Sequence, residues 1–162
     1  MPKRAQKLFI RPATAEDLPA INSLVERVYV QMGGYSLDQL RGQINHFPEG
    51  HMIAVYEDIV VGYSASIRIS EARALSSHTW REITGGGFAS THQPDGDWLY
   101  GYEVCVDPEY RGLRLGQRLY AARRKLCTDL MLKGIAFGGR IPGYARRARK
   151  FESPEAYCEA VR

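Results

Sequence analysis

The sequence of 162 residues is poor in cysteine and has no long apolar run. Its three cysteines, Cys105, Cys127 and Cys158, are odd in number and lack the spacing of metal ligands. They exclude a disulfide framework and indicate reduced thiols in a cytoplasmic protein. No apolar run approaches the ~20 residues of a membrane span, which excludes a transmembrane helix. Acidic residues are outnumbered by basic ones, and the net charge of +4 suits an anionic ligand as well as weak nucleic-acid binding.

Apolar periodicity organises the first part of the chain. It predicts a strand at 8–12, helices at 14–28 and 36–47, and a hairpin of strands at 52–56 and 59–69. Thr14 and Ser36 each open a capping-box pattern, which places the two helix starts. Gly62 inside the second hairpin strand predicts a bulge or a close backbone approach.

Between residues 70 and 97 the periodicity lapses into a long polar stretch rich in glycine. A connection of this length inside a compact domain is usually functional or disordered, and we expect a loop or insert that covers a ligand site. Its histidines and aspartates, His78, His92, Asp95 and Asp97, match no standard ligand spacing, so we expect no metal.

The most informative stretch runs from residue 98 to residue 133. Aromatic and β-branched residues predict a strand at 98–107, a basic glycine turn follows at 108–116, and apolar spacing predicts a helix that continues to Lys133. Free amides and the helix dipole at such a turn, together with Arg111 and Arg114, predict a phosphate ligand. An ordinary turn with solvated arginines would give the same pattern.

The order of residues in this turn carries a family resemblance. The run Val-Asp-Pro-Glu-Tyr-Arg-Gly at 106–112, followed by Leu-Arg-Leu-Gly-Gln-Arg-Leu-Tyr at 113–120, resembles the acetyl-CoA motif of the GCN5-related N-acetyltransferase (GNAT) superfamily. That motif is written Gln/Arg-x-x-Gly-x-Gly/Ala, and Arg114 stands here where its middle glycine is usual. The run Ile-Arg-Pro-Ala-Thr-Ala-Glu-Asp-Leu-Pro-Ala-Ile at 10–21 is a second point of resemblance.

The resemblance implies a single α/β domain over residues 1–162, with a mixed, mostly antiparallel sheet flanked by helices. It implies acetyl-CoA as acyl donor, with its pyrophosphate in the turn and its thioester against the preceding strand. The implied acetyl-CoA contacts are Val104, Cys105, Val106, Arg111, Gly112, Leu113, Arg114, Leu115, Gly116 and Gln117.

Catalytic candidates follow from the chemistry of amine acetylation, which needs a base and a proton donor. Glu103 is the only carboxylate within the central strand and is the candidate base; a salt bridge at the strand edge is the alternative role. Tyr144 or Tyr157 could donate a proton to the leaving thiol. The resemblance places Tyr29, Tyr35 and Arg140 near the acceptor, although Tyr29 could equally fill the core.

Over its whole length the chain resembles the N-terminal GNAT half of two-domain bacterial proteins whose other half is a carbon–nitrogen hydrolase of the nitrilase type. Ser153 and Pro154 predict the start of a last helix. A GNAT domain usually continues with two more strands after this helix, so we expect a domain without its C-terminal hairpin. The resulting open strand favours pairing with a second copy of the chain, as a homodimer.

Three functions are compatible with the sequence. The first is an N-acetyltransferase that acts on a small-molecule or protein amine, and the second is a non-catalytic acyl-CoA-binding domain that regulates a linked hydrolase. The third, a nucleic-acid-binding module, depends only on the basic run at 146–150 and the net charge.

Overall fold

The computed structural model describes residues 8–161, and its centre is a five-stranded sheet in the order β1-β2-β3-β4-β5. The strands are β1 (Leu8–Pro12), β2 (His51–Tyr56), β3 (Ile59–Ile69), β4 (Trp98–Val106) and β5 (Gly134–Phe137). Neighbouring strands are antiparallel except β4 and β5, which run parallel. The predicted α/β fold with a mostly antiparallel sheet is confirmed.

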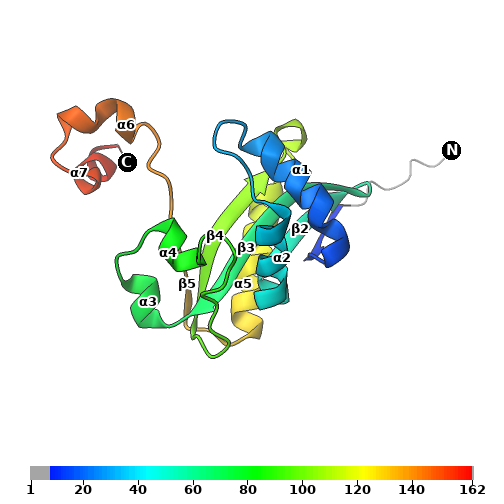
Figure 1. Cartoon of the computed structure of the whole chain (residues 1–162). Helices are drawn as coiled ribbons and strands as arrows, with labels where there is room; N and C mark the ends of the chain where they lie inside the picture. Colours follow the sequence, from blue (N-terminus) through cyan, green and yellow to red (C-terminus); the bar gives the residue numbers. More distant parts are fainter. Residues whose placement is uncertain (1–7, 162) are drawn as a thin grey trace.

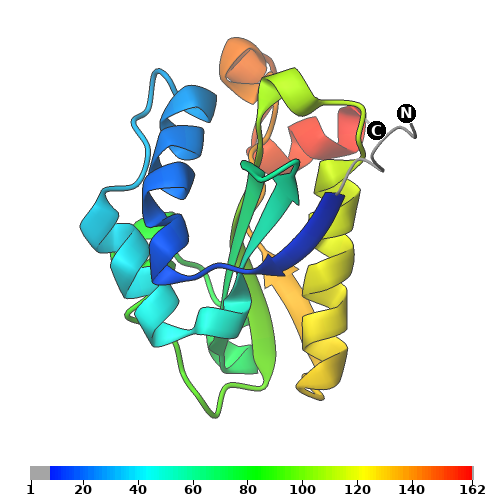
Figure 2. The same ribbon diagram turned by 90° about the vertical axis from the view of Figure 1, so that its right-hand side faces the viewer.

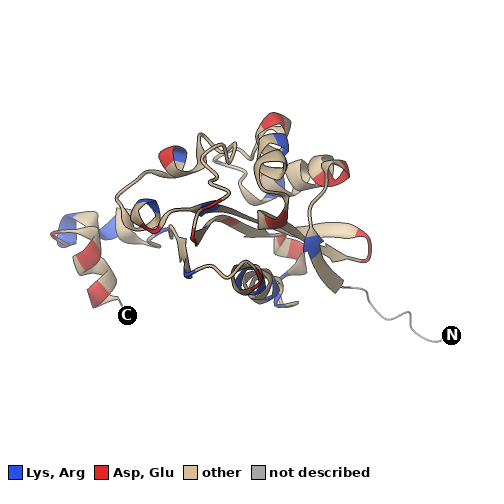
Figure 3. Ribbon diagram, turned by 90° about the horizontal axis from the view of Figure 1, so that it is seen from below, with Lys and Arg blue, Asp and Glu red and all other residues tan. Residues whose placement is uncertain are grey.

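Helices cover both faces of this sheet (Figures 1 and 2). On one face, the 3₁₀ turn Ala15–Asp17 leads into α1 (Leu18–Val28), and α2 (Leu37–His46) follows. On the other face lies α5 (Leu115–Asp129). Charged residues are concentrated on the helices, whereas the ribbon of the sheet between them is largely uncharged (Figure 3). Within residues 8–161, no helix combines the length and the apolar character needed to cross a membrane.

The apolar patterns form the cores that they predict. The larger core lies between the sheet and α1 and α2, and includes Ile21, Leu24 and Leu40, which are fully buried. Smaller clusters around Leu119 and Leu126 pack α5 against the opposite face. The capping boxes at Thr14 and Ser36 are both present, so both predicted helix starts are confirmed.

The helix α5 ends earlier than its periodicity indicates. It stops at Asp129, and Met131 takes a positive φ of 53° with its side chain 89% exposed. The Lys133 N–H then donates to Asp97 O at 2.8 Å, and Gly134 begins β5 instead of ending the helix. The predicted continuation to Lys133 is therefore wrong, because pairing beside β4 requires an extended chain from residue 134.

Two bulges shape the central strands. The β2–β3 register skips Val61, next to Gly62, which confirms the predicted bulge. The second bulge, which the sequence analysis did not predict, lies in β4: Ala65 pairs with Glu103 and Ser66 with Gly101, so Tyr102 is the extra residue. Because a bulge shifts the alternation of side chains, Tyr102 and Glu103 both face α1 and α2.

The strands β4 and β5 separate half-way along β4. Their pairing runs from Trp98 opposite Gly134 to Gly101 opposite Phe137 and then ends, although β4 continues to Val106. Beyond Gly101, the edge of β4 that faces β5 has no strand partner among residues 8–161. A V-shaped gap therefore opens in the sheet directly beside the bulge.

The stretch from residue 70 to residue 97 contains two short helices, α3 (Glu71–Leu75) and α4 (Trp80–Thr84). Polar contacts hold it against β3: the Ser70 N–H donates to Gln93 Oε1 at 2.7 Å, and Arg68 Nε donates to Gly96 O at 2.9 Å. Each helix has only five residues, too few for a clear apolar period, which explains the lapse in the sequence pattern.

After β5 the chain leaves the sheet. It forms α6 (Tyr144–Arg147), the 3₁₀ turn Ala148–Lys150 and α7 (Pro154–Ala160), which stand to one side of the sheet in Figure 1. Ser153 caps α7 as predicted, with its Oγ accepting from the Ala156 N–H at 3.2 Å.

Candidate active site

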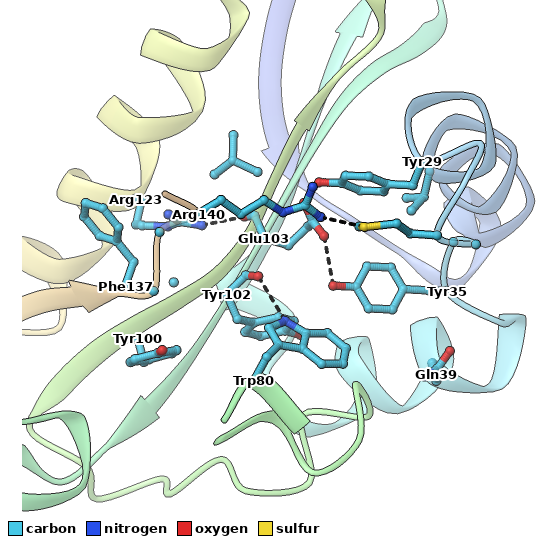
Figure 4. Close-up of a pocket in the computed structure, with 18 of the residues that line it drawn as sticks. Tyr29, Tyr35, Gln39, Trp80, Tyr100, Tyr102, Glu103, Arg123, Phe137 and Arg140 are labelled. Atoms are coloured by element: carbon cyan, nitrogen blue, oxygen red, sulfur yellow. Dashed lines mark hydrogen bonds between the residues drawn. The ribbon is translucent and has the colours of Figure 1, made fainter. Parts of the chain in front are cut away.

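A cavity of about 860 Å³ lies at the point of the V-shaped gap. Its walls come from the end of α1 and the loop that follows it, from α4, from β4 and α5, and from the loop after β5 (Figure 4). The lining is rich in aromatic rings, among them Tyr29, Tyr35, Trp80, Tyr100, Tyr120 and Phe137. The side chain of Trp80 brings the stretch 70–97 into this wall, as expected for a segment that covers a ligand site.

Among residues 8–161, Glu103 is the only carboxylate that lines the cavity. The Tyr29 hydroxyl donates to its Oε1 at 2.5 Å, and the Tyr35 hydroxyl donates to its Oε2 at 2.9 Å (Figure 4). Burial raises the pKa of Glu103, and the two tyrosine hydrogen bonds oppose that rise without cancelling it. Among the ion pairs of residues 8–161, none involves Glu103, so the carboxylate is held by neutral donors rather than by a strand-edge salt bridge.

The two tyrosines remain protonated donors. Burial is the main cause that raises the pKa of both hydroxyls, and the neighbouring Glu103 raises it further. Tyr35 belongs to the buried core, whereas Tyr29 is half-buried at the cavity wall. The structure therefore brings together Glu103, Tyr29 and Tyr35, three of the residues selected from the sequence.

Arg140 completes the mouth of the cavity. Its guanidinium lies 5.7 Å from the ring centre of Tyr29, and its Nη2 is 3.3 Å from Met32 Sδ. The loop after β5 thus meets the loop after α1 across the opening (Figure 4). Arg140 thus places a positive charge near Glu103, at the entrance of the cavity.

The sequence analysis missed Arg123, which lies on α5 and is 3% exposed. Its Nε donates to Ser66 Oγ at 2.9 Å, and its Nη2 donates to Ala65 O at 3.1 Å and to Glu103 O at 2.8 Å. These acceptors belong to the strands on either side of the bulge. The side chain also lines the cavity, and burial lowers its pKa. Because Arg123 lies within the apolar stripe of the predicted helix, the sequence pattern did not indicate its contacts with the two strands.

A histidine–tyrosine pair, also missed, lies across the cavity from Tyr29. His78 Nδ1 is 2.7 Å from Ser76 O, and its Nε2 is 2.7 Å from the Tyr100 hydroxyl. Because a carbonyl only accepts, we assign the proton of neutral His78 to Nδ1, and the Tyr100 hydroxyl donates to Nε2. Both residues line the cavity. No group of three or more metal-ligating side chains occurs in the described part of the chain.

A second hollow, of about 350 Å³, lies at the basic glycine turn and collects most of the residues selected there. They are Val106, Arg111, Gly112, Arg114, Leu115, Gly116 and Gln117. Gly112 has a φ of +94°, and Arg114, at the N-cap of α5, has a φ of 55°. Gly116 borders open space. The first helical bond runs from the Arg118 N–H to Arg114 O at 3.0 Å, which leaves the preceding amides directed at the hollow.

The strand β4 joins the two hollows. The Asp107 N–H donates to Val61 O at 2.9 Å, so by alternation the N–H groups of Val104 and Val106 point away from β3, toward the gap. By the same alternation, the Cys105 N–H points toward β3. The Cys105 side chain is buried on the side of α1, and burial raises the pKa of its thiol. Leu113 packs beside Val104 and Val106. Two of the three strand amides selected from the sequence therefore face the gap.

The structure does not bring Tyr144 and Tyr157 to the cavity. Their rings pack on each other at 5.5 Å in the C-terminal segment, and the Tyr157 hydroxyl donates to Pro142 O at 2.8 Å. Neither residue lines the cavity.

Comparisons with known proteins agree with this geometry. The sequence model of the acetyltransferase (GNAT) family matches residues 18–138. The chain is 37% identical over 156 residues to the probable hydrolase YhcX of Bacillus subtilis, covering 96% of this chain and 30% of that protein. It is 31% identical over 163 residues to the uncharacterized N-acetyltransferase YkwB of the same organism, covering 98% of this chain and 72% of the relative.

A solved structure, the GphF GNAT-like decarboxylase in complex with isobutyryl-CoA, has a TM-score of 0.77 and 25% identity over 94% of this chain and 76% of its own. The chain thus spans less than a third of YhcX but most of the other two proteins.

Proposed function

The chain belongs to the acetyltransferase (GNAT) family, and from that premise we propose that it transfers an acetyl group from acetyl-CoA to an amine by direct attack. The turn at 111–117 binds the pyrophosphate through free helix amides and Arg111. The pantetheine arm lies in the gap beside β4, where the N–H groups of Val104 and Val106 are available to it. The thioester then reaches the point of the V, beside Glu103.

Glu103 is the general base of this proposal. Its carboxylate lies in the cavity and is fixed by Tyr29 and Tyr35. Because burial raises its pKa, it is a better proton acceptor than an exposed carboxylate. This fixed, half-buried carboxylate at the point of the gap is the observation that carries the proposal. The acceptor amine enters past Arg140 and Tyr29, and is a small molecule or an exposed amine of a protein.

The test is release of free thiol from acetyl-CoA with a panel of amines, for the wild type and for Glu103→Gln. We expect turnover with at least one amine, and a loss of about 10²–10⁴-fold in kcat in the variant, the usual contribution of a general base. Acetyl-CoA affinity is expected to stay within about threefold, because the turn is untouched. A variant as active as the wild type would remove Glu103 from the mechanism.

A second candidate, acyl-CoA binding without transfer, is favoured by one observation. Tyr144 and Tyr157, the residues selected as donors to the leaving thiol, lie outside the cavity. A protein that only senses acyl-CoA needs no such donor. Tight acetyl-CoA binding without thiol release on any amine would favour this function.

A further inference from the structure

Arg123 uses only part of its hydrogen-bonding capacity. Its Nε and Nη2 are bonded to Ser66, Ala65 and Glu103, but Nη1 has no hydrogen-bond partner among residues 8–161. The only buried side-chain nitrogen or oxygen without a partner in that part of the chain is Trp98 Nε1. Since Arg123 lines the cavity, its Nη1 must reach the open space of the cavity. Two N–H groups of a buried cation are thus available to a ligand.

The position of this guanidinium is tightly defined. A Cβ on Gly101 would lie 2.5 Å from Nη1, so the strand leaves room for the group only because residue 101 is glycine. On its other side the guanidinium lies 5.4 Å from the ring centre of Tyr120. Gly101 is also the last residue of β4 that pairs with β5. Nη1 is therefore fixed at the point of the V.

The Glu103 carboxylate is near enough to act on the charge of Arg123, but it forms no ion pair with the guanidinium. None of the ion pairs in the described chain includes Arg123, and its three acceptors are a hydroxyl and two main-chain carbonyls. A buried cation without a directly paired anion is costly, and such a site favours a ligand that is negative or becomes so. The Ser66 hydroxyl accepts from Nε and both main-chain carbonyls accept from Nη2, so a purely structural role leaves Nη1 unexplained.

We propose that Arg123 is a catalytic residue that donates from Nη1 to the thioester oxygen of the acyl donor. The inference rests on the proposed function, which places that thioester at the point of the gap. Arg123 acts there together with the Val104 N–H. The charge of Arg123 stabilises the oxygen most strongly when that oxygen becomes an anion. The preorganised guanidinium is held by three bonds before any substrate arrives.

An amine acceptor attacks the thioester through its nitrogen. The nitrogen lone pair forms the new C–N bond at the thioester carbon, and the C=O π pair moves onto oxygen, where Arg123 stabilises it. One amine proton passes to Glu103. The oxygen pair then re-forms the carbonyl, the C–S bond breaks, and CoA leaves as a thiolate that takes a proton from water.

The test is the infrared carbonyl band of acetyl-CoA labelled with ¹³C at the carbonyl, bound to the wild type, to Arg123→Gln and to Arg124→Gln. Arg124 is the exposed neighbour of Arg123 on α5, so its variant removes the same charge outside the cavity. Calorimetry on the same samples measures acetyl-CoA affinity. We expect a band at lower frequency than in water for the wild type and Arg124→Gln, and a return toward the water value in Arg123→Gln. The kcat of Arg123→Gln is expected to fall about 10²–10³-fold, as for loss of one oxyanion donor.

The outcomes separate this inference from the proposed function. Acetyl-CoA that binds with an unshifted carbonyl, or with the same shift in Arg123→Gln, overturns the role of Arg123 and leaves donor binding intact. Absence of acetyl-CoA binding overturns both. If Arg123→Gln does not fold, Ser66→Ala takes its place, because it removes only the acceptor of Nε. A weaker shift in that variant supports the proposal, and an unchanged shift contradicts it.

Discussion

The chemistry of the cavity depends on one carboxylate and its two donors. Glu103 must be ionised to accept a proton, and burial works against ionisation by raising its pKa above the ordinary 4.5. Tyr29 and Tyr35 stabilise the charged form through hydrogen bonds of 2.5 and 2.9 Å. The pKa of Glu103 therefore depends on the two tyrosine hydrogen bonds.

This coupling predicts the pH dependence of activity. We expect kcat/KM to rise with pH through the raised pKa of Glu103, because only the ionised base is active. In Tyr29→Phe the carboxylate loses a donor that lowers its pKa, so the acidic limb of the profile moves to higher pH. Tyr56→Phe, on the far side of the sheet from α1, is the control and leaves the limb in place. A limb that stays where it is in Tyr29→Phe would contradict this view of the site.

The sequence indicated which residues belong to the site, but not which way their side chains point. Glu103 could be selected because it is the only carboxylate in the strand, and Arg111, Gly112 and Gly116 because a phosphate turn needs such residues. The face that Glu103 occupies depends on the bulge at Tyr102, whose only local signal is Gly101. Arg123 could not be found because its partners are main-chain carbonyls exposed by that same bulge.

Among the elements, β1 and α1 are joined by a partly buried ion pair. Arg11 donates twice to the Asp17 carboxylate, at 2.7 and 2.8 Å, and Asp17 also accepts from the Thr14 N–H at 2.8 Å. Hydrogen bonding to Arg11 is the main cause that lowers the pKa of Asp17 below its ordinary 3.8. A carboxyl with a lowered pKa stabilises the fold above its unfolded pKa, and this stability is lost as the pH falls through the folded pKa.

We therefore expect Asp17→Asn to reduce the free energy of unfolding at pH 7 by about 1–2 kcal/mol, the range for hydrogen bonds to a partly buried charge. Urea unfolding at a series of pH values measures the difference. It should shrink as the pH falls from about 4, the unfolded pKa, through the lowered pKa of Asp17, where the folded wild type also loses its charge. Asp95→Asn, at an exposed position, is the control. A difference that is constant down to acid pH would show that the charge of Asp17 does not contribute.

Elements with a long apolar period were predictable, and short ones were not. The strands β1 to β4 and the helices α1 and α2 follow directly from spacing and capping residues. The end of α5 was missed because Leu130 continues the apolar stripe, whereas the chain must turn at Met131 to bring Gly134 beside Trp98. That requirement comes from the sheet and has no counterpart in local sequence.

The gap between β4 and β5 is a property of the whole molecule. It arises where parallel pairing ends at Gly101 and Phe137, and α1, α4, α5 and the loop after β5 close around it (Figures 1 and 4). No single segment encodes such a gap, so local sequence patterns do not predict it. The two hollows that β4 connects match a ligand with a phosphate group at one end and a reactive group at the other.

The most direct test of this account is a calorimetric titration of the protein with acetyl-CoA, beside Gly116→Asp and Thr128→Asp. A Cβ at Gly116 meets nothing within 4 Å, so the first variant is expected to fold and to place a negative charge in the phosphate hollow. Thr128→Asp adds the same charge at an exposed site near the other end of α5. We predict binding by the wild type and Thr128→Asp, and affinity lower by roughly 100-fold in Gly116→Asp, since like charges brought together cost several kcal/mol. Absence of binding by the wild type, or equal affinity in all three proteins, would contradict the assignment of the turn and gap to acyl-CoA.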